Sequence, residues 1–371
     1  MRTLVVSDLH LGAASGKDLA RRPALRAPLI QALRGAGRLV VLGDGLELRE
    51  AAHRDAAAHA EAFLREAGAA LGADGEVLVL AGNHDHGLIA GWIDARLQTE
   101  MSGFLGLAEP VEPGQAGPLA GRLAELVRPA RLRISYPGAW LRDDVYAIHG
   151  HYLDLHSTTP TFERLAAGAM ARWVVQLPEH GARPDDYEAA LAPLYAFLHQ
   201  LTQRSDHAAV SAGAGASARA WVALAGDGRE RHPVRAAALG AGYVGAVALL
   251  NALGLGPVDR DLSGIALRRG GLHGMREVLR RLGVTAPYVL FGHTHRAGPW
   301  PQDDASEWRT PAGSRLVNTG SWVYQPHFLS AEPNASPYWP GTAVELVDGE
   351  PPRLRRLLGD RDHAELRRAL G

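Results

Sequence analysis

The feature that most constrains this chain is a short apolar segment that recurs and each time ends in polar side chains able to bind a metal ion. Such segments are residues 3–7, 38–42, 76–80, 145–148 and 287–291. Short apolar strands that alternate with helical sequence are typical of a sheet buried under helices, so the pattern predicts an α/β fold. Ligands usually bind beyond the carboxyl ends of such strands, and five strand ends can therefore form one site.

The polar side chains that follow these segments are Asp8 and His10, Asp44, Asn83 and His84, His149, and His293 and His295. The first and last pairs are spaced two residues apart, which places both members on one face of an extended strand end. Glycines before Asp44, Asn83 and His293 let the backbone turn sharply next to an ion or a phosphate. Asp8-x-His10 and Gly43-Asp44 alone are weak signals, and the motifs at 82–85 and 292–295 are moderately specific, but their order at successive strand ends predicts one shared metal site.

The chain of 371 residues has no cysteine and 17 histidines. A disulfide framework, a thiolate metal site and a cysteine nucleophile are therefore excluded. Any metal must be held by Asp, Glu, Asn and His, which suit hard or borderline divalent ions. The formal net charge of −1 gives no general attraction to nucleic acid, so such a partner is not expected, although a local groove could still be basic.

Residues 159–284 differ from the sequence on either side, because they are rich in Ala, Leu and Arg at helical spacing and have few strand-like runs. We therefore expect a core whose first half is 1–158 and whose second half, with a C-terminal tail, is 285–371, and a helical insertion, or cap, between them. Residues 102–130, rich in Gly and Pro, predict a long loop or a helical excursion. A Gly- and Ser-rich segment near 211–217 is typical of a flexible joint.

The most apolar stretch of the insertion, 236–256, is about as long as a membrane span. It is mostly Ala and Gly, so a buried helix or hairpin of the cap is the first expectation. A hydrophobic lid that touches a lipid-like substrate or makes peripheral membrane contact is the second, and a true span is the third. The run 3–6 before Asp8 is too short for a signal peptide, which predicts a cytoplasmic location over the mature form of a secreted protein.

Together these motifs resemble the calcineurin-like metallophosphoesterase superfamily, whose pattern is Asp-x-His, Gly-Asp, Gly-Asn-His-Asp/Glu, a lone His often followed by Gly, and Gly-His-x-His. Asn318-Thr319-Gly320-Ser321 is also similar to a segment that often follows the last motif. The resemblance covers residues 1–158 and 285–350 and none of the insertion. It implies a four-layer α-β-β-α sandwich of two mixed β-sheets flanked by helices, with a helical insertion.

The resemblance also implies a ligand set for two divalent transition metal ions. One ion would be held by Asp8, His10 and His295, the other by Asn83, His149 and His293, and Asp44 would bridge both. Manganese is the first expectation, with Fe, Zn, Co or Ni as alternatives. His151 faces the same side as His149 by strand alternation and is the alternative ligand at that position.

The activity that the resemblance implies is hydrolysis of a phosphoester, with a hydroxide that bridges the two ions as the nucleophile. His84 follows the ligand Asn83 but is not assigned to a metal, so we expect it to protonate the leaving oxygen as a general acid. Glu47, three residues after Asp44, is expected to orient His84, with a solvated loop acid as the simpler interpretation. Asp85 is expected to support the site from outside the ligand set.

The motifs leave the substrate open. The segment 43–49, Gly-Asp-Gly-Leu-Glu-Leu-Arg, departs from the Gly-Asp-x-Val-Asp-Arg-Gly pattern of protein Ser/Thr phosphatases. The apolar insertion resembles the caps of UDP-diacylglucosamine pyrophosphatases, although those enzymes usually carry Arg in place of His84. A lipid-linked or nucleotide pyrophosphate, a phosphodiester and a small phosphomonoester all remain candidate substrates.

Two further alternatives concern the function of the whole chain and the role of the arginines in the insertion. A catalytically idle scaffold is the competing function class, but a scaffold would not need the full ligand set together with His84. Four arginines of the insertion could contact phosphate, or could lie on solvated helix faces. They are Arg164, Arg172, Arg268 and Arg269.

Overall fold

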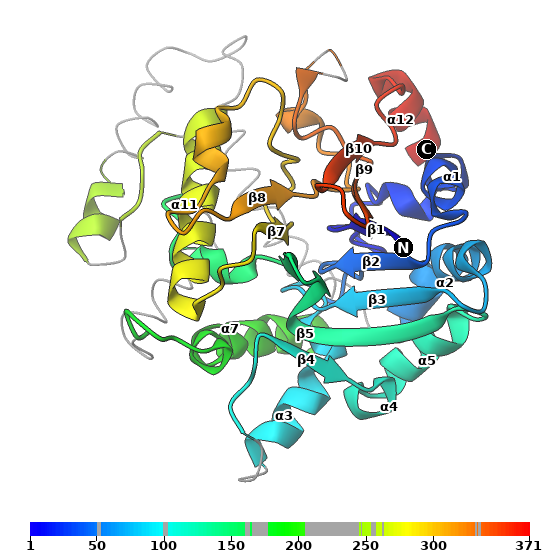
Figure 1. The fold of residues 1–371 in the computed structure, drawn as a ribbon, viewed down its shortest axis with the longest axis horizontal. Coiled ribbons are helices and arrows are strands. Elements are labelled where there is room, and N and C mark those ends of the chain that lie inside the picture. The colour runs from blue at the N-terminus through cyan, green and yellow to red at the C-terminus, as the bar shows by residue number, and fades with distance from the viewer. Residues whose placement is uncertain are drawn as a thin grey trace. The chain divides into compact units, whose positions relative to one another are not determined.

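A computed structural model describes residues 1–49, 53–98, 103–159, 164, 177–204, 245, 247–253, 257–261, 263–330, 332 and 335–371. The protein is a mixed α/β structure (Figure 1), which confirms the predicted fold class. Contacts divide the chain into two compact units: unit 1 comprises Met1–His151 with Thr285–Gly371, and unit 2 comprises Tyr152–Val284. Every residue of the predicted metal site belongs to unit 1.

Unit 1 is built on a connected mixed sheet. In the described part of the chain its order is β10-β9-β1-β2-β3-β5-β6-β7-β8, with β4 paired to β5. The strands are β1 Arg2–Val6, β2 Arg38–Leu42, β3 Glu76–Leu80, β4 Ala108–Val111, β5 Arg131–Arg142, β6 Val145–Ile148, β7 Tyr288–Phe291, β8 Arg315–Asn318, β9 Thr342–Val347 and β10 Arg353–Arg356. Strands β1, β2, β3 and β5 are parallel neighbours, as are β6, β7 and β8. The two parallel sets meet at the antiparallel pair β5–β6.

The longest strand, β5, changes partners along its length. Residues 131–135 pair with β3, whereas residues 138–142 pair with β6. Pro137 lies between these two segments and cannot donate a ladder hydrogen bond. At Gly138 an added Cβ would lie 2.6 Å from the Ala147 carbonyl oxygen, so only glycine permits this close approach to β6. The sheet therefore curls at this point.

The curl encloses an apolar core between the two halves of the sheet. Its buried side chains come from both halves, namely Val5, Val40, Leu42, Leu78, Leu80, Ala139, Leu141, Val145, Ala147, Leu290, Val317, Val344 and Leu346. The other face of the first half packs against helices α1 (Pro23–Leu33), α2 (His53–Leu71), α5 (Pro118–Leu126) and α12 (His363–Leu370), seen together in Figure 1. Alternate strand residues thus serve two cores, which explains why the strands are apolar throughout.

The remaining helices complete the two units. They are α3 Ala90–Gln98, α4 Pro113–Ala116, α7 Pro184–Arg204 and α11 Gly264–Leu282, with 3-10 turns η1 Leu19–Arg21, η2 His86–Leu88, η3 His151–Leu155, η4 Ala305–Trp308 and η5 Pro326–Phe328. The segment 102–130 contains β4, α4 and α5, so a helical excursion describes it better than a long loop. In unit 2, Ser263 caps the start of α11, because its hydroxyl accepts the Ala266 N–H. Gly283 caps the end of the helix in a left-handed conformation.

The apolar stretch 236–256 is described only at residues 245 and 247–253. There, Leu249 and Leu253 are exposed and Val247 is buried. Among the described residues no helix is both long and apolar enough to cross a membrane. The rest of this stretch, and the joint predicted near 211–217, lie outside the described residues.

Two helical glycines of unit 1 give a matched test of the packing. A Cβ at Gly68 in α2 would lie 2.6 Å from the Val127 carbonyl carbon, whereas a Cβ at Gly121 in α5 meets nothing within 4 Å. Alanine is favoured over glycine in an open helix by about 1 kcal/mol. We therefore expect Gly121→Ala to raise the free energy of unfolding by about 0.5–1 kcal/mol and Gly68→Ala to lower it, as measured by urea denaturation. Stabilisation by Gly68→Ala would contradict the close approach of α2 to residue 127.

Candidate metal centre

The loops that follow the strands are joined by backbone hydrogen bonds. The Asp8 N–H donates to the Gly43 carbonyl over 3.1 Å, which links the loops after β1 and β2. The Gly292 N–H donates to the His149 carbonyl over 2.8 Å, which links the loops after β6 and β7. Residues separated by more than 100 positions in sequence are thereby held at one edge of the sheet.

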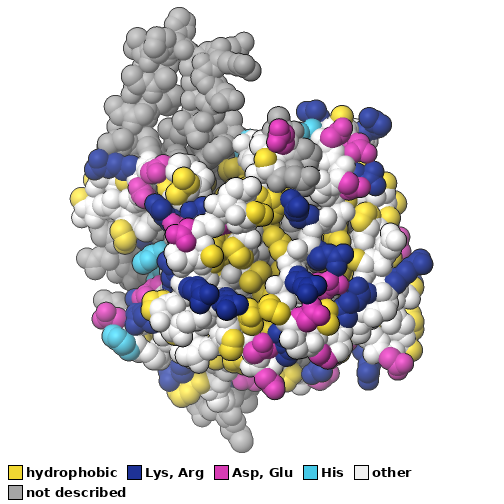
Figure 2. All heavy atoms as spheres, turned by 45° about the horizontal axis from the view of Figure 1, so that its top comes forward, with side chains coloured by type: hydrophobic (Ala, Val, Ile, Leu, Met, Phe, Trp, Pro, Cys, Tyr) yellow, Lys and Arg dark blue, Asp and Glu magenta, His cyan; other side chains and the backbone are white. Residues whose placement is uncertain are grey.

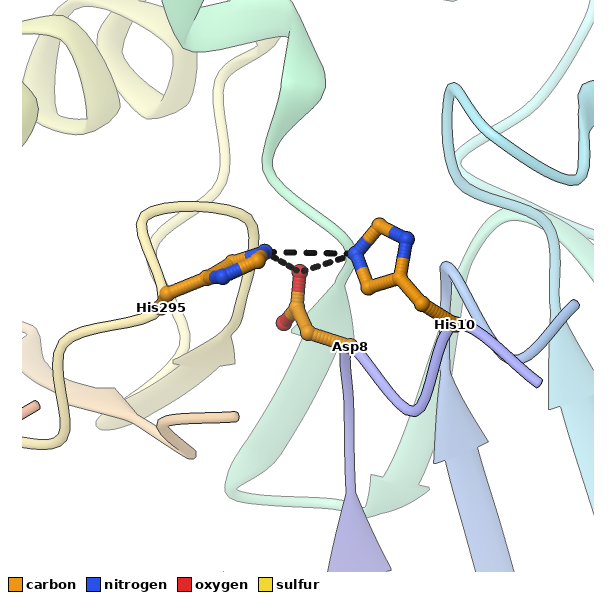
Figure 3. A group of neighbouring side chains, drawn as sticks. All are labelled: Asp8, His10 and His295. Carbon is orange, nitrogen blue, oxygen red and sulfur yellow. Dashed lines mark hydrogen bonds and ion pairs between the residues drawn. The ribbon is translucent and has the colours of Figure 1, made fainter. Parts of the chain in front are cut away.

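The predicted ligands form two groups, each with three side chains whose ligand atoms lie within 4.8 Å of one another: Asp8, His10 and His295, and Asp44, His149 and His293. A third group of this kind combines His10 and Asp44 with the candidate acid His84. In the first group the side chains point toward one another from the loops after β1 and β7 (Figure 3). His295 Nε2 lies 3.3 Å from Asp8 Oδ1 and 3.2 Å from His10 Nε2. This spacing of oxygen and imidazole donors suits a divalent ion.

Asp44 lies between the two groups. Its Oδ2 atom is 3.2 Å from His149 Nε2 in one group and 3.7 Å from His10 Nε2 in the other. Its Oδ1 atom accepts the His84 N–H over 2.8 Å, which fixes the plane of the carboxylate. One oxygen atom therefore faces both groups, as a bridging ligand requires.

Asp8 provides a direct test of whether a cation fits here. The carboxylate is fully buried, and its Oδ2 atom accepts hydrogen bonds from the Ser7 hydroxyl and, over 3.0 Å, from the His293 N–H. Its Oδ1 atom is buried without a hydrogen-bond partner and faces His295. A buried carboxylate oxygen without a donor is costly, and a cation among these side chains would remove that cost.

The amide of Asn83 gives a second test. Its Oδ1 atom points at three atoms that can accept hydrogen bonds: Asp44 Oδ2 and His293 Nδ1, both at 3.2 Å, and His149 Nε2 at 3.3 Å. Hydrogen bonding alone would favour the reverse orientation of the amide. A cation coordinated by Oδ1 favours the orientation seen here, which places Asn83 with Asp44, His149 and His293.

The backbone is strained at the ligand positions. Among the described residues, the non-glycine residues with positive φ are Asp8 (52°), His10 (45°), Asp44 (51°), His293 (66°) and His295 (57°). For residues other than glycine this left-handed conformation costs on the order of 1 kcal/mol or more each. All five are predicted ligands, so the strain is concentrated at the metal centre, where ligand positions and not local preference determine the backbone.

Buried carboxylates determine the pKa values of the neighbouring histidines in this centre. Burial opposes a charge on His149, but Asp44 outweighs it and raises the His149 pKa to about 10. For His10, burial is likewise outweighed by the hydrogen bond to Glu47 and by Asp44, which raise the pKa to about 9. Burial would raise the pKa of Asp44, but His149 and His84 hold it well below its usual range. The buried carboxylates therefore favour positive charge among the imidazoles.

Glu47 connects one ligand to the candidate acid. Its buried Oε2 atom lies 3.0 Å from His10 Nδ1 and 2.7 Å from His84 Nδ1. Burial would raise its pKa, but the charge of His84 and the hydrogen bond with His10 lower it well below the usual range. The solvated-loop interpretation of Glu47 is therefore wrong, because the carboxylate is 2% exposed and positions two imidazoles at once.

Asp85 supports the metal-binding loops through hydrogen bonds with their backbone. Its buried carboxylate accepts backbone N–H groups from Gly82 (2.6 Å), Asp44 (3.2 Å), Gly45 (2.7 Å) and Leu46 (3.3 Å). It thereby holds the loops after β2 and β3 together. Burial and the nearby Asp44 raise the Asp85 pKa to about 6. The sequence indicated a supporting role but not these four contacts.

His149, and not His151, lies in a ligand group. His151 is fully buried with its ring centroid 5.6 Å from that of His149. Burial and the neighbouring His149 lower its pKa well below the ordinary value, which favours the neutral ring. The structure therefore favours the choice of His149 over His151.

The segment after the last motif supports the loop that carries His293 and His295. Asn318 Nδ2 donates to the Gly292 carbonyl over 2.9 Å and to Thr294 Oγ1 over 3.0 Å. Asn318 Oδ1 in turn accepts the Gly320 N–H over 2.9 Å. The side chain of Asn318 thus fixes the strained loop between the two histidine ligands.

The arginines of the insertion give a mixed result. Arg164 is buried in unit 2, and its Nε atom donates to the Ser157 carbonyl, so the solvated-face interpretation is wrong for this residue. Arg269 is exposed and Arg268 is half-buried, and Arg172 lies outside the described residues.

The sequence motifs assigned no role to Arg49, whose Nη1 atom lies 3.2 Å from His84 Nε2. No motif signals that contact, because it depends on the packing of two loops.

No protein-family model matches the chain, and no curated protein matches it either. The resemblance drawn from the motifs therefore rests on the sequence motifs alone.

Metal binding itself is the first prediction for this centre. We expect the chain to bind two Mn²⁺ ions, and a 100-fold excess over the dissociation constants to raise the free energy of unfolding by about 3 kcal/mol for each occupied site. Asp44→Asn should weaken both sites, whereas His295→Ala should remove one. Calorimetric titration and elemental analysis measure the stoichiometry, with the exposed His180→Ala as the matched control. Full stoichiometry in both site variants would contradict the ligand assignment.

The role of Asp85 is testable without metal. Asp85→Ala leaves four backbone N–H groups without their acceptor, so we expect it to lower the free energy of unfolding by about 3 kcal/mol. Asp94→Ala, at an exposed position of α3, should change the stability by less than about 0.5 kcal/mol. Equal stability of the two variants in urea denaturation would show that Asp85 does not hold the loops.

Proposed function

We propose that the chain is a metal-dependent phosphoester hydrolase with a dinuclear centre, related to the calcineurin-like metallophosphoesterases. The observation that carries this proposal is the position of Asp44, whose Oδ2 atom faces His10 of one ligand group and His149 of the other, beside a histidine held by a buried glutamate. One ion would be held by Asp8, His10 and His295, the other by Asn83, His149 and His293, with Asp44 between them. Two bound ions would activate a water molecule and stabilise charge on the phosphoryl oxygens.

The side chains of the chain divide the remaining work. In hydrolysis the water oxygen bonds to phosphorus, the bond from phosphorus to the leaving oxygen breaks, and the leaving oxygen takes a proton. His84 is placed to give that proton from Nε2, because its Nδ1 atom is hydrogen-bonded to Glu47. Glu47 fixes the ring orientation and, through the same oxygen atom, the ring of His10.

The chemical types of the ligand atoms restrict which metal ions the centre would bind. Carboxylate, amide and imidazole donors, with no thiolate in the chain, fit Mn first and Fe, Zn, Co or Ni as alternatives. Availability in the cell and the geometry of the loaded centre decide among them. The proposal also keeps the predicted cytoplasmic location.

We extend the proposal to the fold. The apolar core between the two halves of the curled sheet supports a sandwich, and helices α1, α2, α5 and α12 supply one outer layer. The four-layer arrangement requires a second helical layer on the outer face of β6, β7 and β8.

Nucleic acid remains an unfavoured substrate. On the face drawn in Figure 2, basic and acidic side chains are intermixed, with apolar side chains between them. A groove of about 900 Å³ is lined by Arg128, Arg131 and Arg133, but it contains the starts of β3 and β5 and none of the metal-site residues. Peripheral membrane contact through 236–256 stays a prediction, and the exposed Leu249 and Leu253 are compatible with it.

The competing function is a catalytically idle scaffold. A panel of phosphomonoesters, phosphodiesters, nucleotides and lipid phosphates, assayed with Mn²⁺ and with chelator, separates the two. We expect hydrolysis that Mn²⁺ supports and chelator abolishes. If the metal-loaded protein hydrolyses no member of the panel, the scaffold is the better account.

The acid role of His84 has its own test. His84→Ala should lower kcat about 100-fold or more on phenyl phosphate, whose leaving group needs a proton. The loss on p-nitrophenyl phosphate should be smaller, because that leaving group is stable as an anion. Metal content, measured by elemental analysis, should stay at the wild-type value. Equal losses on the two esters would argue against proton donation by His84.

A further inference from the structure

The side chain of Arg49 lies beside the candidate acid at the edge of the metal centre. Its Nη1 atom is 3.2 Å from His84 Nε2 and 3.2 Å from the side-chain amide of Asn83. A guanidinium has donors only, so its contact with His84 is an N–H donated to the ring nitrogen. The side chain is half-buried and therefore reaches both the centre and solvent.

Two donors converge at this point. With Asn83 Oδ1 directed into the ligand group, the amide nitrogen of Asn83 is the atom that faces Arg49 Nη1. An anionic oxygen placed beside them would accept from both, next to the ions that the centre would hold.

The position of Arg49 is determined by its loop. Its backbone N–H donates to Glu47 Oε1 over 3.0 Å, and the preceding Leu48 N–H donates to the His84 carbonyl over 3.1 Å. The same glutamate that orients the candidate acid therefore also anchors Arg49. These contacts place the backbone of Arg49 at the edge of the metal centre.

We propose that Arg49, with the amide nitrogen of Asn83, binds a non-bridging phosphoryl oxygen of the substrate, and that this contact makes a terminal phosphate the favoured substrate class over a phosphodiester. The proposal rests on the phosphoester hydrolase function above. A terminal phosphate carries three non-bridging oxygens and close to two negative charges. A diester carries only two non-bridging oxygens and one negative charge, so it offers the guanidinium a weaker partner.

The contact also has a consequence for His84. While Arg49 donates to Nε2, that nitrogen holds no proton for the leaving group. A phosphoryl oxygen that takes over the Arg49 N–H frees Nε2 to take a proton from solvent, which His84 then gives to the leaving oxygen. Arg49 would thus act both on the substrate and, indirectly, on the acid.

The experiment compares two esters with the same leaving group, p-nitrophenyl phosphate and bis(p-nitrophenyl) phosphate, on the Mn²⁺-loaded protein. Arg49→Met should lower kcat/KM about 100-fold on the monoester and less than about fivefold on the diester. Arg49→Lys keeps the charge without the planar fork and should restore about tenfold of the monoester loss. Arg122→Met, which removes an exposed arginine paired with Glu125 on α5, should behave as wild type.

The outcomes separate this proposal from the proposed function. Equal losses on the two esters, or no loss in Arg49→Met at wild-type metal content and melting temperature, overturn the role of Arg49 while hydrolysis itself stands. If the wild type hydrolyses neither ester, the wider substrate panel decides the hydrolase proposal, and calorimetry with inorganic phosphate on the Mn²⁺-loaded proteins decides the Arg49 contact. Phosphate binding that is at least about tenfold weaker in Arg49→Met than in the wild type supports the Arg49 contact, and equal phosphate binding overturns it.

Discussion

The burial of two carboxylates among histidines is the constraint on which the rest of unit 1 depends. Asp8 and Asp44 are almost fully removed from solvent, and each has one oxygen atom directed toward imidazole rings. Their other oxygen atoms accept backbone N–H groups, from His293 and His84 respectively. A metal ion would complete the set of interactions, because buried charge is tolerated only when it is paired or coordinated.

The strained backbone follows from the same constraint. Short strands end abruptly, and their last side chains must turn toward one point instead of continuing the alternation of the sheet. Five ligand residues accept a left-handed conformation to do so. Supporting residues keep the strained loops in place: Asp85 holds the loops after β2 and β3, and Asn318 holds the loop after β7.

The sequence was sufficient for the parts of the fold that local patterns determine. The apolar runs located β1, β2, β3, β6 and β7, because strands buried on both faces need apolar residues throughout. The sequence Tyr136-Pro137-Gly138 is typical of a strand end, and it is the pairing with β6 that continues β5 beyond it. The mixed α/β class is confirmed, whereas the four-layer sandwich stays a proposal.

The candidate site also has a part that the sequence predicted and a part that it did not. Side chains that follow strands were found from their motifs, and the structure brings all seven predicted ligands, with His84, to one edge of the sheet. Glu47 was expected to orient His84, but its second contact, with His10, and the contact of Arg49 with His84 were not predicted, because they arise where separate loops pack. Contacts between side chains of distant loops have no periodic signal in a sequence.

The most direct test of the central claim is anomalous diffraction from crystals grown with Mn²⁺. The account predicts two anomalous peaks about 3.5–4 Å apart, one among Asp8, His10 and His295 and one among Asn83, His149 and His293. Asp44 should contact both peaks. A single peak, or peaks at other side chains of unit 1, would contradict the dinuclear centre.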